Sequence, residues 1–400
     1  MKLSHTMILF TLLLALLLTG CSLRPTPSAA PEATLPPPAE PDTQEPPEDA
    51  MVETFLSNMT IEEKVGQLFF VRPDALDPSQ AAENGRGVQE MTAALGNALV
   101  RYPVGGVVIF ARNIDSPEQL RAFLADLQRA SKTPLIFAVD EEGGAVTRLA
   151  ERSDFGLPRY SSAAAVGREG AEAVKAMGTA IGGYLREYGF TMDFAPVADV
   201  YSDPTNPVIG LRAFSGEAES AAVLSGTMAA ALRAAGITPV YKHFPGHGNT
   251  VGDSHTGLAV CYATLEELRG CEWLPYTTND LTGCGVMVGH IALPAVTGEM
   301  TPASLSEKIV GGYLRGEIGF DGLVITDSLA MGGVLVSYTN EQAAVAALQA
   351  GCDVLLMPDD LPGAYRAVLS AVQSGELTES RIDESVRRIL RCKLQAGLMG

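Results

Sequence analysis

Eight short apolar runs, separated mostly by stretches with helical periodicity, are the feature that most limits how this chain folds. The runs are rich in Val, Ile, Leu and Phe, and they cover residues 65–71, 106–110, 135–140, 190–195, 237–242, 285–290, 322–327 and 354–357. Helical spacing of apolar residues occurs in segments 116–130, 163–188, 217–235, 264–280, 304–318 and 340–350. Continuous apolar strands that alternate with helices predict a parallel sheet buried on both faces. Because there are eight such units, we expect a (β/α)8 barrel of the TIM type rather than an open doubly wound sheet.

A single folded domain accounts for most of the chain. We expect one catalytic domain over residues 51–400, because the last helical segment, 379–396, runs almost to the final residue. The formal net charge of the whole chain is −19. A chain this acidic has no general electrostatic affinity for nucleic acid or for an anionic membrane surface. We therefore expect no nucleic-acid partner, and a membrane contact only through a lipid anchor.

The first fifty residues have the composition of a targeting segment rather than of a fold. A basic start precedes an apolar run over 7–18, which is typical of a secretory signal. The run ends in Leu18-Thr-Gly-Cys21, which resembles the bacterial lipobox, where cleavage precedes a cysteine that then carries lipid. We expect a signal peptide over 1–20, lipidation of Cys21, and a Pro- and Glu-rich disordered tether over 21–50. The protein would then be extracytoplasmic and anchored to the outer face of the cell membrane. The alternative is an ordinary secretory signal with a chance cysteine.

The cysteines do not define a disulfide framework. If Cys21 carries lipid, an odd number remains, so a complete set of disulfides is impossible. The remaining residues are Cys261, Cys271, Cys284, Cys352 and Cys392. Cys261 and Cys271 flank one helical segment, and their pairing stays open. No spacing matches a structural zinc site, and we expect no metal and no cofactor.

One polar stretch, residues 241–258, holds three of the five histidines of the chain. They are His243, His247 and His255, and Lys242 and Asp253 accompany them. Asp253 lies two residues before His255, a spacing at which the carboxylate orients the imidazole and favours its protonated form. The pair is a candidate proton-transfer device on a glycine-containing loop.

Polar residues also follow several of the predicted strands. These residues are Arg112, Asn113, Asp140, Glu141, Lys242, His243, His290 and Asp327. Barrel active sites gather at the carboxyl ends of the strands, so we expect these side chains to converge. Any one of them taken alone is equally compatible with a helix cap or an ion pair at the barrel rim. Together, Asp140, Lys242, His243 and Asp327 predict one polar cavity.

Five motifs carry a resemblance to a known family. They are Asp140-Glu-Glu-Gly-Gly-Ala-Val-Thr-Arg148, Asn206-Pro-Val-Ile-Gly-Leu-Arg212, Lys242-His-Phe-Pro-Gly-His-Gly248, Asp253-Ser-His255 and Ile325-Thr-Asp-Ser-Leu-Ala-Met331. In this order they resemble the β-N-acetylglucosaminidases of glycoside hydrolase family 3, which include the bacterial β-hexosaminidases. The resemblance covers essentially all of residues 51–400.

The resemblance implies a role for each matching residue. Asp327 matches the family's nucleophile, His255 its acid/base, and Asp253 the partner of that histidine. The residues that match those holding the sugar before the cleaved bond are Asp140, Arg148, Arg212, Lys242 and His243. A retaining glycosidase needs an attacking carboxylate and a second group that protonates the leaving oxygen and then deprotonates water. Imidazole titrates near neutral pH, which suits a group with both duties.

We therefore expect a retaining exo-β-N-acetylglucosaminidase, a type of β-N-acetylhexosaminidase, that hydrolyses terminal β-linked GlcNAc. The resemblance and the expected anchor favour peptidoglycan fragments as the substrate. Alternatives within the family are a GlcNAc phosphorylase and a β-glucosidase-type enzyme. Two other classes stay open: a metal-dependent hydrolase that uses His243, His247, His255 and Asp253, and a sugar-binding lipoprotein without catalysis.

Overall fold

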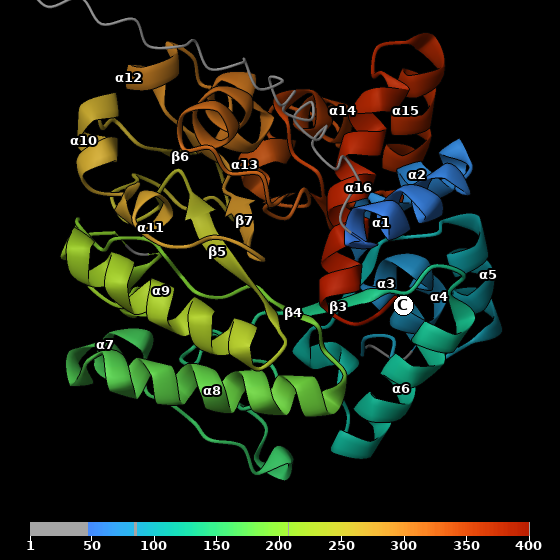
Figure 1. Ribbon diagram of the computed structural model, residues 1–400, viewed down its shortest axis with the longest axis horizontal. Helices are drawn as coiled ribbons and strands as arrows, with labels where there is room; N and C mark the ends of the chain where they lie inside the picture. Colours follow the sequence, from blue (N-terminus) through green and yellow to red (C-terminus); the bar gives the residue numbers. More distant parts are fainter. Residues whose placement is uncertain (1–46, 84–85, 207, 400) are drawn as a thin grey trace, which may run out of the picture. The chain divides into compact units, whose positions relative to one another are not determined.

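The computed structural model describes residues 47–83, 86–206 and 208–399 (Figure 1). The expected signal peptide over 1–20, Cys21 and nearly all of the expected tether lie outside these residues. The first described element is the helix α1 (Pro47–Ser57), so residues 47–50, the end of the expected tether, are helical. Asp49 and Glu53 of α1 pair with Arg391 and Arg387 of the last helix, α16 (Glu379–Gln395), and these ion pairs hold α1 against α16.

Eight parallel strands form the central sheet. They are β1 (Phe69–Val71), β2 (Gly106–Val108), β3 (Ile136–Val139), β4 (Met192–Asp193), β5 (Thr238–Phe244), β7 (Gly285–Val288), β9 (Leu323–Thr326) and β10 (Leu355–Leu356). Their order is β10-β1-β2-β3-β4-β5-β7-β9, and a parallel bridge between Ile325 and Val354 joins the two ends of the sheet. In register, Val71 lies beside Val107 and Val108 beside Ala138. The predicted (β/α)8 barrel is confirmed.

Helices of the outer layer form where the apolar periodicity and a capping residue coincide. In α6 (Pro117–Ala130), Ser116 Oγ accepts the N–H of Gln119 at 3.1 Å, and Pro117 occupies the first turn, where it costs no hydrogen bond. The buried face of α6 consists of Leu120, Phe123, Leu124 and Leu127. This spacing places the four side chains along one stripe against the barrel.

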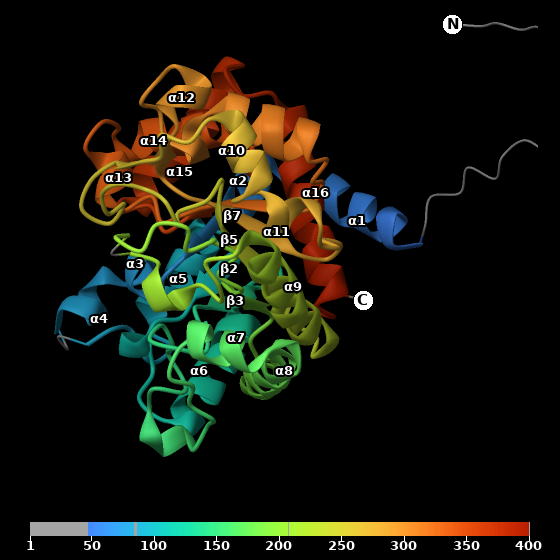
Figure 2. The ribbon, with the colours of Figure 1, turned by 90° about the vertical axis from the view of Figure 1, so that its left-hand side faces the viewer.

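Two of the outer helices approach each other unusually closely. Figures 1 and 2 show α8 (Ala171–Tyr188) and α9 (Ala218–Ala234) lying side by side. A Cβ atom at Gly178 would lie 2.8 Å from Ala231 Cβ, and one at Gly182 would lie 2.6 Å from Ala235 Cβ. The two glycines of α8 therefore set the distance between these helices.

The other helices of the described part complete the outer layer and the loops. They are α2 (Ile61–Gln67), α3 (Pro73–Leu76), α4 (Pro78–Glu83), α5 (Ala93–Arg101), α7 (Ala163–Glu169), α10 (Leu265–Gly270), α11 (Leu274–Thr277), α12 (Pro294–Thr297), α13 (Gly332–Leu335), α14 (Asn340–Ala350) and α15 (Leu361–Ser374). Short 3-10 turns are η1 (Ala111–Asn113), η2 (Ser153–Phe155), η3 (Gly210–Arg212) and η4 (Ala303–Leu305), and η5 (Lys308–Glu317) is a π-helix. No helix in these ranges is both long and apolar enough to cross a membrane.

Several predicted boundaries are wrong. The first run, 65–71, begins inside α2, because Thr60 and Glu63 form a capping box that starts a helix there. The predicted helix 264–280 is broken into α10 and α11, and Pro275 lies in the first turn of the second piece. Gly170, at φ 97°, likewise divides 163–188 into α7 and α8. An unpredicted pair of short strands, β6 (Ala259–Val260) and β8 (Ile291–Ala292), lies beside the barrel.

The thiols of the described part are free. This applies to Cys261 and Cys271, the pair whose bonding the sequence left open, and to Cys284, Cys352 and Cys392.

Candidate active site

A cavity of about 410 Å³ opens at the carboxyl ends of the barrel strands. Its polar lining consists of Arg72, Asp140, Glu142, Arg148, Arg212, Lys242, His243, His247, Ser254, His255, Asp327 and Ser328. Its apolar lining includes Phe110, Phe194, Met287, Leu356 and Met357. Every predicted sugar-binding residue, together with Asp327 and His255, lines this cavity. Asp253 does not line it but contacts His255 directly.

Four residues from the predicted strand ends do not line the cavity: Arg112, Asn113, Glu141 and His290. The ring of His290 is buried and lies against Ser304 Oγ and Ser328 O. Arg112 and Asn113 lie in η1, which follows β2, and both contact Asp74 instead. Glu141 points away from the cavity and accepts a hydrogen bond from Tyr184 of α8 at 2.9 Å. For Arg112 and Asn113 the expected convergence is therefore wrong, because the chain turns into a 3-10 helix before their side chains reach the opening.

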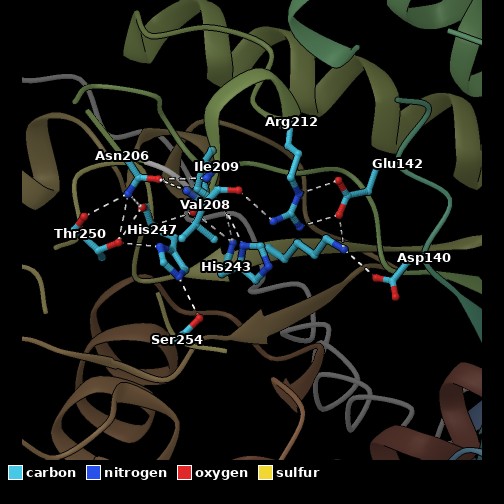
Figure 3. Close-up of polar contacts among 12 residues, drawn as sticks. Asp140, Glu142, Asn206, Val208, Ile209, Arg212, His243, His247, Thr250 and Ser254 are labelled. Carbon is cyan, nitrogen blue, oxygen red and sulfur yellow. Dashed lines mark hydrogen bonds and ion pairs between the residues drawn. The ribbon is translucent and has the colours of Figure 1, made fainter. Parts of the chain in front are cut away.

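Five charged side chains on the cavity wall form a continuous network, here called the charged cluster: Asp140, Glu142, Arg148, Arg212 and Lys242. Lys242 Nζ lies 2.8 Å from Asp140 Oδ1 and 2.7 Å from Glu142 Oε1. Arg212 donates two hydrogen bonds to Glu142, at 2.9 and 2.7 Å, as the forked contact in Figure 3 shows. Arg148 Nη2 lies 3.3 Å from Asp140 Oδ2. The cluster holds donors and acceptors in fixed positions at the cavity surface.

Glu142 is a member of this cluster that the sequence analysis missed. Burial disfavours its charged form, but the charges of Lys242 and Arg212 outweigh burial and lower the pKa of Glu142 to about 2. The same contacts raise the pKa of Lys242 and of Arg212 despite their burial. The only sequence signal was the run of three acids at 140–142, which does not say which of them face inward.

Glu142→Gln is expected to reduce stability in a pH-dependent way. A pKa of about 2 against the ordinary 4.5 corresponds to about 3 kcal/mol at neutral pH. Since the pKa in the folded state is the lower one, this contribution is complete above the unfolded-state pKa and is lost as the pH falls toward 2. Denaturant unfolding should give a lower free energy of unfolding for the variant than for the wild type. This difference should be large near neutral pH and should shrink below about pH 5. We also expect KM to rise by about tenfold, because Arg212 and Lys242 lose their common anchor.

The matched control for this prediction is Glu272→Gln. Glu272 is also buried, but it accepts a hydrogen bond from Ser202 Oγ at 3.0 Å and pairs with no cation among the described residues. Burial raises the pKa of Glu272, so its replacement should not produce the same loss of stability toward neutral pH. If Glu142→Gln lowers the free energy of unfolding by the same amount from pH 7 to low pH, the ionised pairing of Glu142 with Lys242 and Arg212 is contradicted.

His243 is fixed by a second acid that the sequence analysis missed, Asp199. His243 Nδ1 lies 2.7 Å from Asp199 Oδ2, and the same carboxylate accepts the backbone N–H groups of His243 and His247. Burial opposes the charge of Asp199, but the nearby His243 outweighs it and lowers the pKa of Asp199. Because Nδ1 is engaged, Nε2 of His243 is the ring nitrogen left for a ligand in the cavity.

Asp327 follows β9 and presents a carboxylate to the cavity. Its backbone N–H donates to Val288 O at 2.9 Å, and its Oδ1 accepts the N–H of Ser328 at 2.7 Å. Burial disfavours the carboxylate, but the charges of His243 and His290 and the Ser328 hydrogen bond outweigh it and lower the pKa of Asp327. The side chain is therefore an anion at neutral pH, as a nucleophilic carboxylate must be.

The pair Asp253 and His255 lies on residues 245–258, here called the histidine loop. Asp253 Oδ1 lies 2.7 Å from His255 Nδ1 and also accepts the His255 backbone N–H at 2.9 Å. Burial acts to raise the pKa of Asp253, but its contacts with His255 outweigh burial and lower this pKa. The His255 side chain is 62% exposed. With Nδ1 held by Asp253, Nε2 is left to transfer protons at the cavity mouth.

His247 is buried and supports the histidine loop from within. Its Nδ1 lies 2.6 Å from Thr250 Oγ1 and its Nε2 lies 3.0 Å from Ser254 Oγ. Asn206 donates to the backbone oxygens of His247 and Thr250, and Figure 3 shows this group on the side of the site away from Glu142. Both ring nitrogens of His247 have a hydroxyl partner on the histidine loop, so this ring fixes the positions of Thr250 and Ser254.

The three histidines considered as a metal-ligand set do not converge. The rings of His243, His247 and His255 have different partners, which are Asp199, the Thr250 and Ser254 hydroxyls, and Asp253. Across residues 47–83, 86–206 and 208–399, no three His, Cys, Asp or Glu side chains are grouped so that they could hold a metal ion. The described residues therefore offer no set of ligands for the metal-dependent hydrolase considered as an alternative.

The barrel, with carboxylates and imidazoles gathered at the carboxyl ends of its strands, defines a barrel enzyme of the glycoside hydrolase class. The family model for the glycosyl hydrolase family 3 N terminal domain matches residues 60–392. The chain belongs to this family.

Relatives with names and solved structures agree with this membership. A β-hexosaminidase from Idiomarina loihiensis is 33% identical over 303 residues, which is 75% of this chain and 89% of that protein. The β-hexosaminidase LpqI of Mycobacterium tuberculosis is 37% identical over 314 residues, covering 75% of this chain and 79% of LpqI. A family 3 β-N-acetylglucosaminidase structure from Paenibacillus sp. FPU-7 has a TM-score of 0.78 at 36% identity, with 85% of this chain covered. This chain spans 63% of that Paenibacillus chain.

These findings confirm the expected glycoside hydrolase of family 3. The names of the relatives agree with the expected β-N-acetylhexosaminidase class. The individual roles of Asp327, His255 and Asp253 stay predictions.

Proposed function

We propose that this chain is a retaining, exo-acting β-N-acetylglucosaminidase that hydrolyses terminal β-linked GlcNAc. The observation that carries the proposal is the shared cavity, which Asp327 lines from the end of β9 and His255 lines from the histidine loop. Similarity to proteins named β-hexosaminidase and β-N-acetylglucosaminidase supports GlcNAc as the sugar.

In the first half-reaction, an oxygen of the Asp327 carboxylate attacks the anomeric carbon and forms a covalent bond. The bond from that carbon to the glycosidic oxygen breaks, and the oxygen takes the proton from His255 Nε2 as it leaves. Asp253, 2.7 Å from the other ring nitrogen, stabilises the protonated ring before this transfer. In the second half-reaction, neutral His255 accepts a proton from water while the water oxygen displaces Asp327. Two inversions give net retention.

The charged cluster supplies the groups that hold the sugar. Asp140 accepts hydrogen bonds from hydroxyl groups, and Arg148, Arg212 and Lys242 donate to hydroxyl or acetamido oxygens. Met287 of β7 and Leu356 of β10 line the cavity from the barrel strands. Exo action is what the family resemblance implies.

The experiment that tests this function compares release of 4-nitrophenol from its β-GlcNAc and β-glucose glycosides by the full chain, with and without phosphate. We expect turnover of the GlcNAc compound alone and no effect of phosphate on its rate or product. Formation of GlcNAc 1-phosphate would instead support the phosphorylase, and preference for the glucoside would support the β-glucosidase-type alternative. Binding of GlcNAc with turnover of neither compound would support the sugar-binding lipoprotein.

We also propose that the enzyme is lipid-anchored outside the cytoplasm and that peptidoglycan fragments are its natural substrate. The lipobox-like Leu18-Thr-Gly-Cys21 supports the anchor, and an extracytoplasmic position would give access to cell-wall fragments. Cys21→Ser should move the GlcNAc-releasing activity from the membrane fraction to the soluble fraction. Activity that stays in the membrane fraction after this change would contradict lipidation of Cys21.

A further inference from the structure

The nucleophile segment and the histidine loop are joined by two backbone hydrogen bonds that come from a pair of glycines. Gly332 N–H donates to His255 O at 3.2 Å, and Gly333 N–H donates to Ser254 O at 2.9 Å. Both glycines lie at the start of α13, five and six positions after Asp327 in the same segment. The two residues proposed to carry the reaction are thus connected through a short path of backbone.

A Cβ atom does not fit at Gly332 with the loop in place, and one at Gly333 would be crowded. A Cβ atom at Gly332 would lie 2.8 Å from Thr256 C and 3.0 Å from His255 O. At Gly333 it would lie 3.0 Å from Ser254 O and 3.1 Å from His290 Cβ. The neighbouring atoms at both positions are mainly backbone, which cannot rotate away as the end of a side chain can.

The segment that carries the glycines is itself fixed to the barrel. Leu329 N–H donates to Leu356 O at 2.8 Å in β10, and His290 Nε2 lies 2.9 Å from Ser328 O. The glycine pair is therefore a rigid support, and the histidine loop is the part that rests on it.

The tip of the histidine loop, residues 253–257, has few other supports. Within the described residues, the hydrogen bonds that reach this tip from outside the histidine loop come from Gly332 and Gly333. The His255 side chain is 62% exposed, so little packing holds its ring. The position of the imidazole is thus set mainly through the backbone of Ser254 and His255.

We propose that Gly332 and Gly333 are positioning residues that hold His255 at the correct distance from the bond cleaved by Asp327. The proposal deepens the proposed function and rests on the acid/base role of His255. An added methyl group would lift the tip and misplace the imidazole, while Asp327 would keep its own contacts to Val288 and Ser328. The defect would therefore fall on proton transfer and not on nucleophilic attack.

The test is the leaving-group dependence of Gly332→Ala, whose added Cβ would lie 2.8 Å from Thr256 C. With a poor leaving group such as phenol, which needs its oxygen protonated, we expect kcat/KM to fall by about 100-fold. With 2,4-dinitrophenol, which leaves without a proton, kcat/KM should stay within about threefold of wild type. Azide, which attacks the covalent intermediate without a base, should raise kcat of the variant on the dinitrophenyl substrate. Equal losses on both substrates would overturn the proposal.

Gly178→Ala is the matched control. Its added Cβ would also lie under 3.0 Å from neighbouring atoms, Ala231 Cβ and Met228 Sδ, but in the interface of α8 and α9. We expect this variant to lose stability and to keep the wild-type ratio of the two kcat/KM values. A changed ratio in this control would show that any local crowding produces the effect, and would remove the special role of the glycine pair.

Hydrogen exchange of the wild-type enzyme provides a measurement that does not depend on the variant folding. The Gly332 and Gly333 amides should be protected by at least about tenfold over the unstructured rate, because the loop carbonyls accept them. Exchange at the unstructured rate would overturn the proposal. His255→Ala distinguishes failure of the proposed function from failure of the glycine support. A normal leaving-group profile in His255→Ala refutes the proposed function. An abnormal profile in His255→Ala together with a normal profile in Gly332→Ala refutes only the glycine support.

Discussion

Asp327→Ala is expected to lower kcat for an aryl β-GlcNAc by at least about 10⁴-fold, because no covalent intermediate can form without the attacking carboxylate. The remaining groups cannot replace it, since the neighbouring side chains of His243 and of the buried His290 are imidazoles held by other partners. The variant leaves the charged cluster in place, so binding is expected to change much less than turnover.

Azide makes this prediction specific. A small anion in the space left by the Asp327 carboxylate attacks the anomeric carbon once, so the product is the α-glycosyl azide. The matched control is Asp321→Ala, because Asp321 precedes the same strand at its opposite end and pairs with Arg388 on the surface. That variant should keep its turnover. Normal activity of Asp327→Ala, or an equal loss in Asp321→Ala, would refute the nucleophile assignment.

His255→Ala is expected to show the second largest effect, a fall in kcat/KM of about 10²- to 10⁴-fold on substrates with poor leaving groups. Its exposed imidazole, bound at Nδ1 to Asp253, is the group proposed to protonate the leaving oxygen. Substrates with good leaving groups should form the glycosyl-enzyme normally and then stall, because no base activates water. A rapid burst followed by slow turnover is the expected time course.

Azide should accelerate this variant too, but with the opposite stereochemistry. It displaces Asp327 from the covalent intermediate, so the β-glycosyl azide is expected. Asp253→Asn keeps the imidazole and loses the charge beside it, and it should give a smaller defect of the same kind. A loss that is the same for all leaving groups would assign His255 to binding rather than to proton transfer.

The barrel was predictable because its strands are buried on both faces and their residues are continuously apolar. The start of the first strand was not, since an apolar run reads alike in a buried helix and in a strand. Thr60 and Glu63, the capping box of α2, were the signal that 65–67 is helical. The small pair β6 and β8 has no such pattern, because each strand has two residues.

The site was predictable where chemistry and position coincide, as at Asp327 after a strand and at Asp253 two residues before His255. Side-chain direction was not predictable at the turn after β3. There Asp140 and Glu142 face the cavity, whereas Glu141 between them turns to Tyr184. Partners that are distant in sequence, such as Asp199 for His243, depend on strands brought together by the barrel, and no local pattern identifies them.

The role of the glycine pair depends on a contact between distant segments in the same way. The run at 325–331 marks the nucleophile, but the sequence does not indicate that Gly332 and Gly333 meet the loop at 253–257. Only the three-dimensional arrangement connects them.

Covalent trapping tests the central claim most directly. A fluorinated β-GlcNAc derivative with an activated leaving group slows both half-reactions and lets the glycosyl-enzyme accumulate. Mass spectrometry should then find one added sugar per chain, on a peptide that contains 323–331, with the modification at Asp327 and absent from Asp327→Ala. A sugar on another residue, or turnover that releases the α-anomer first without any adduct, would contradict a retaining mechanism through Asp327.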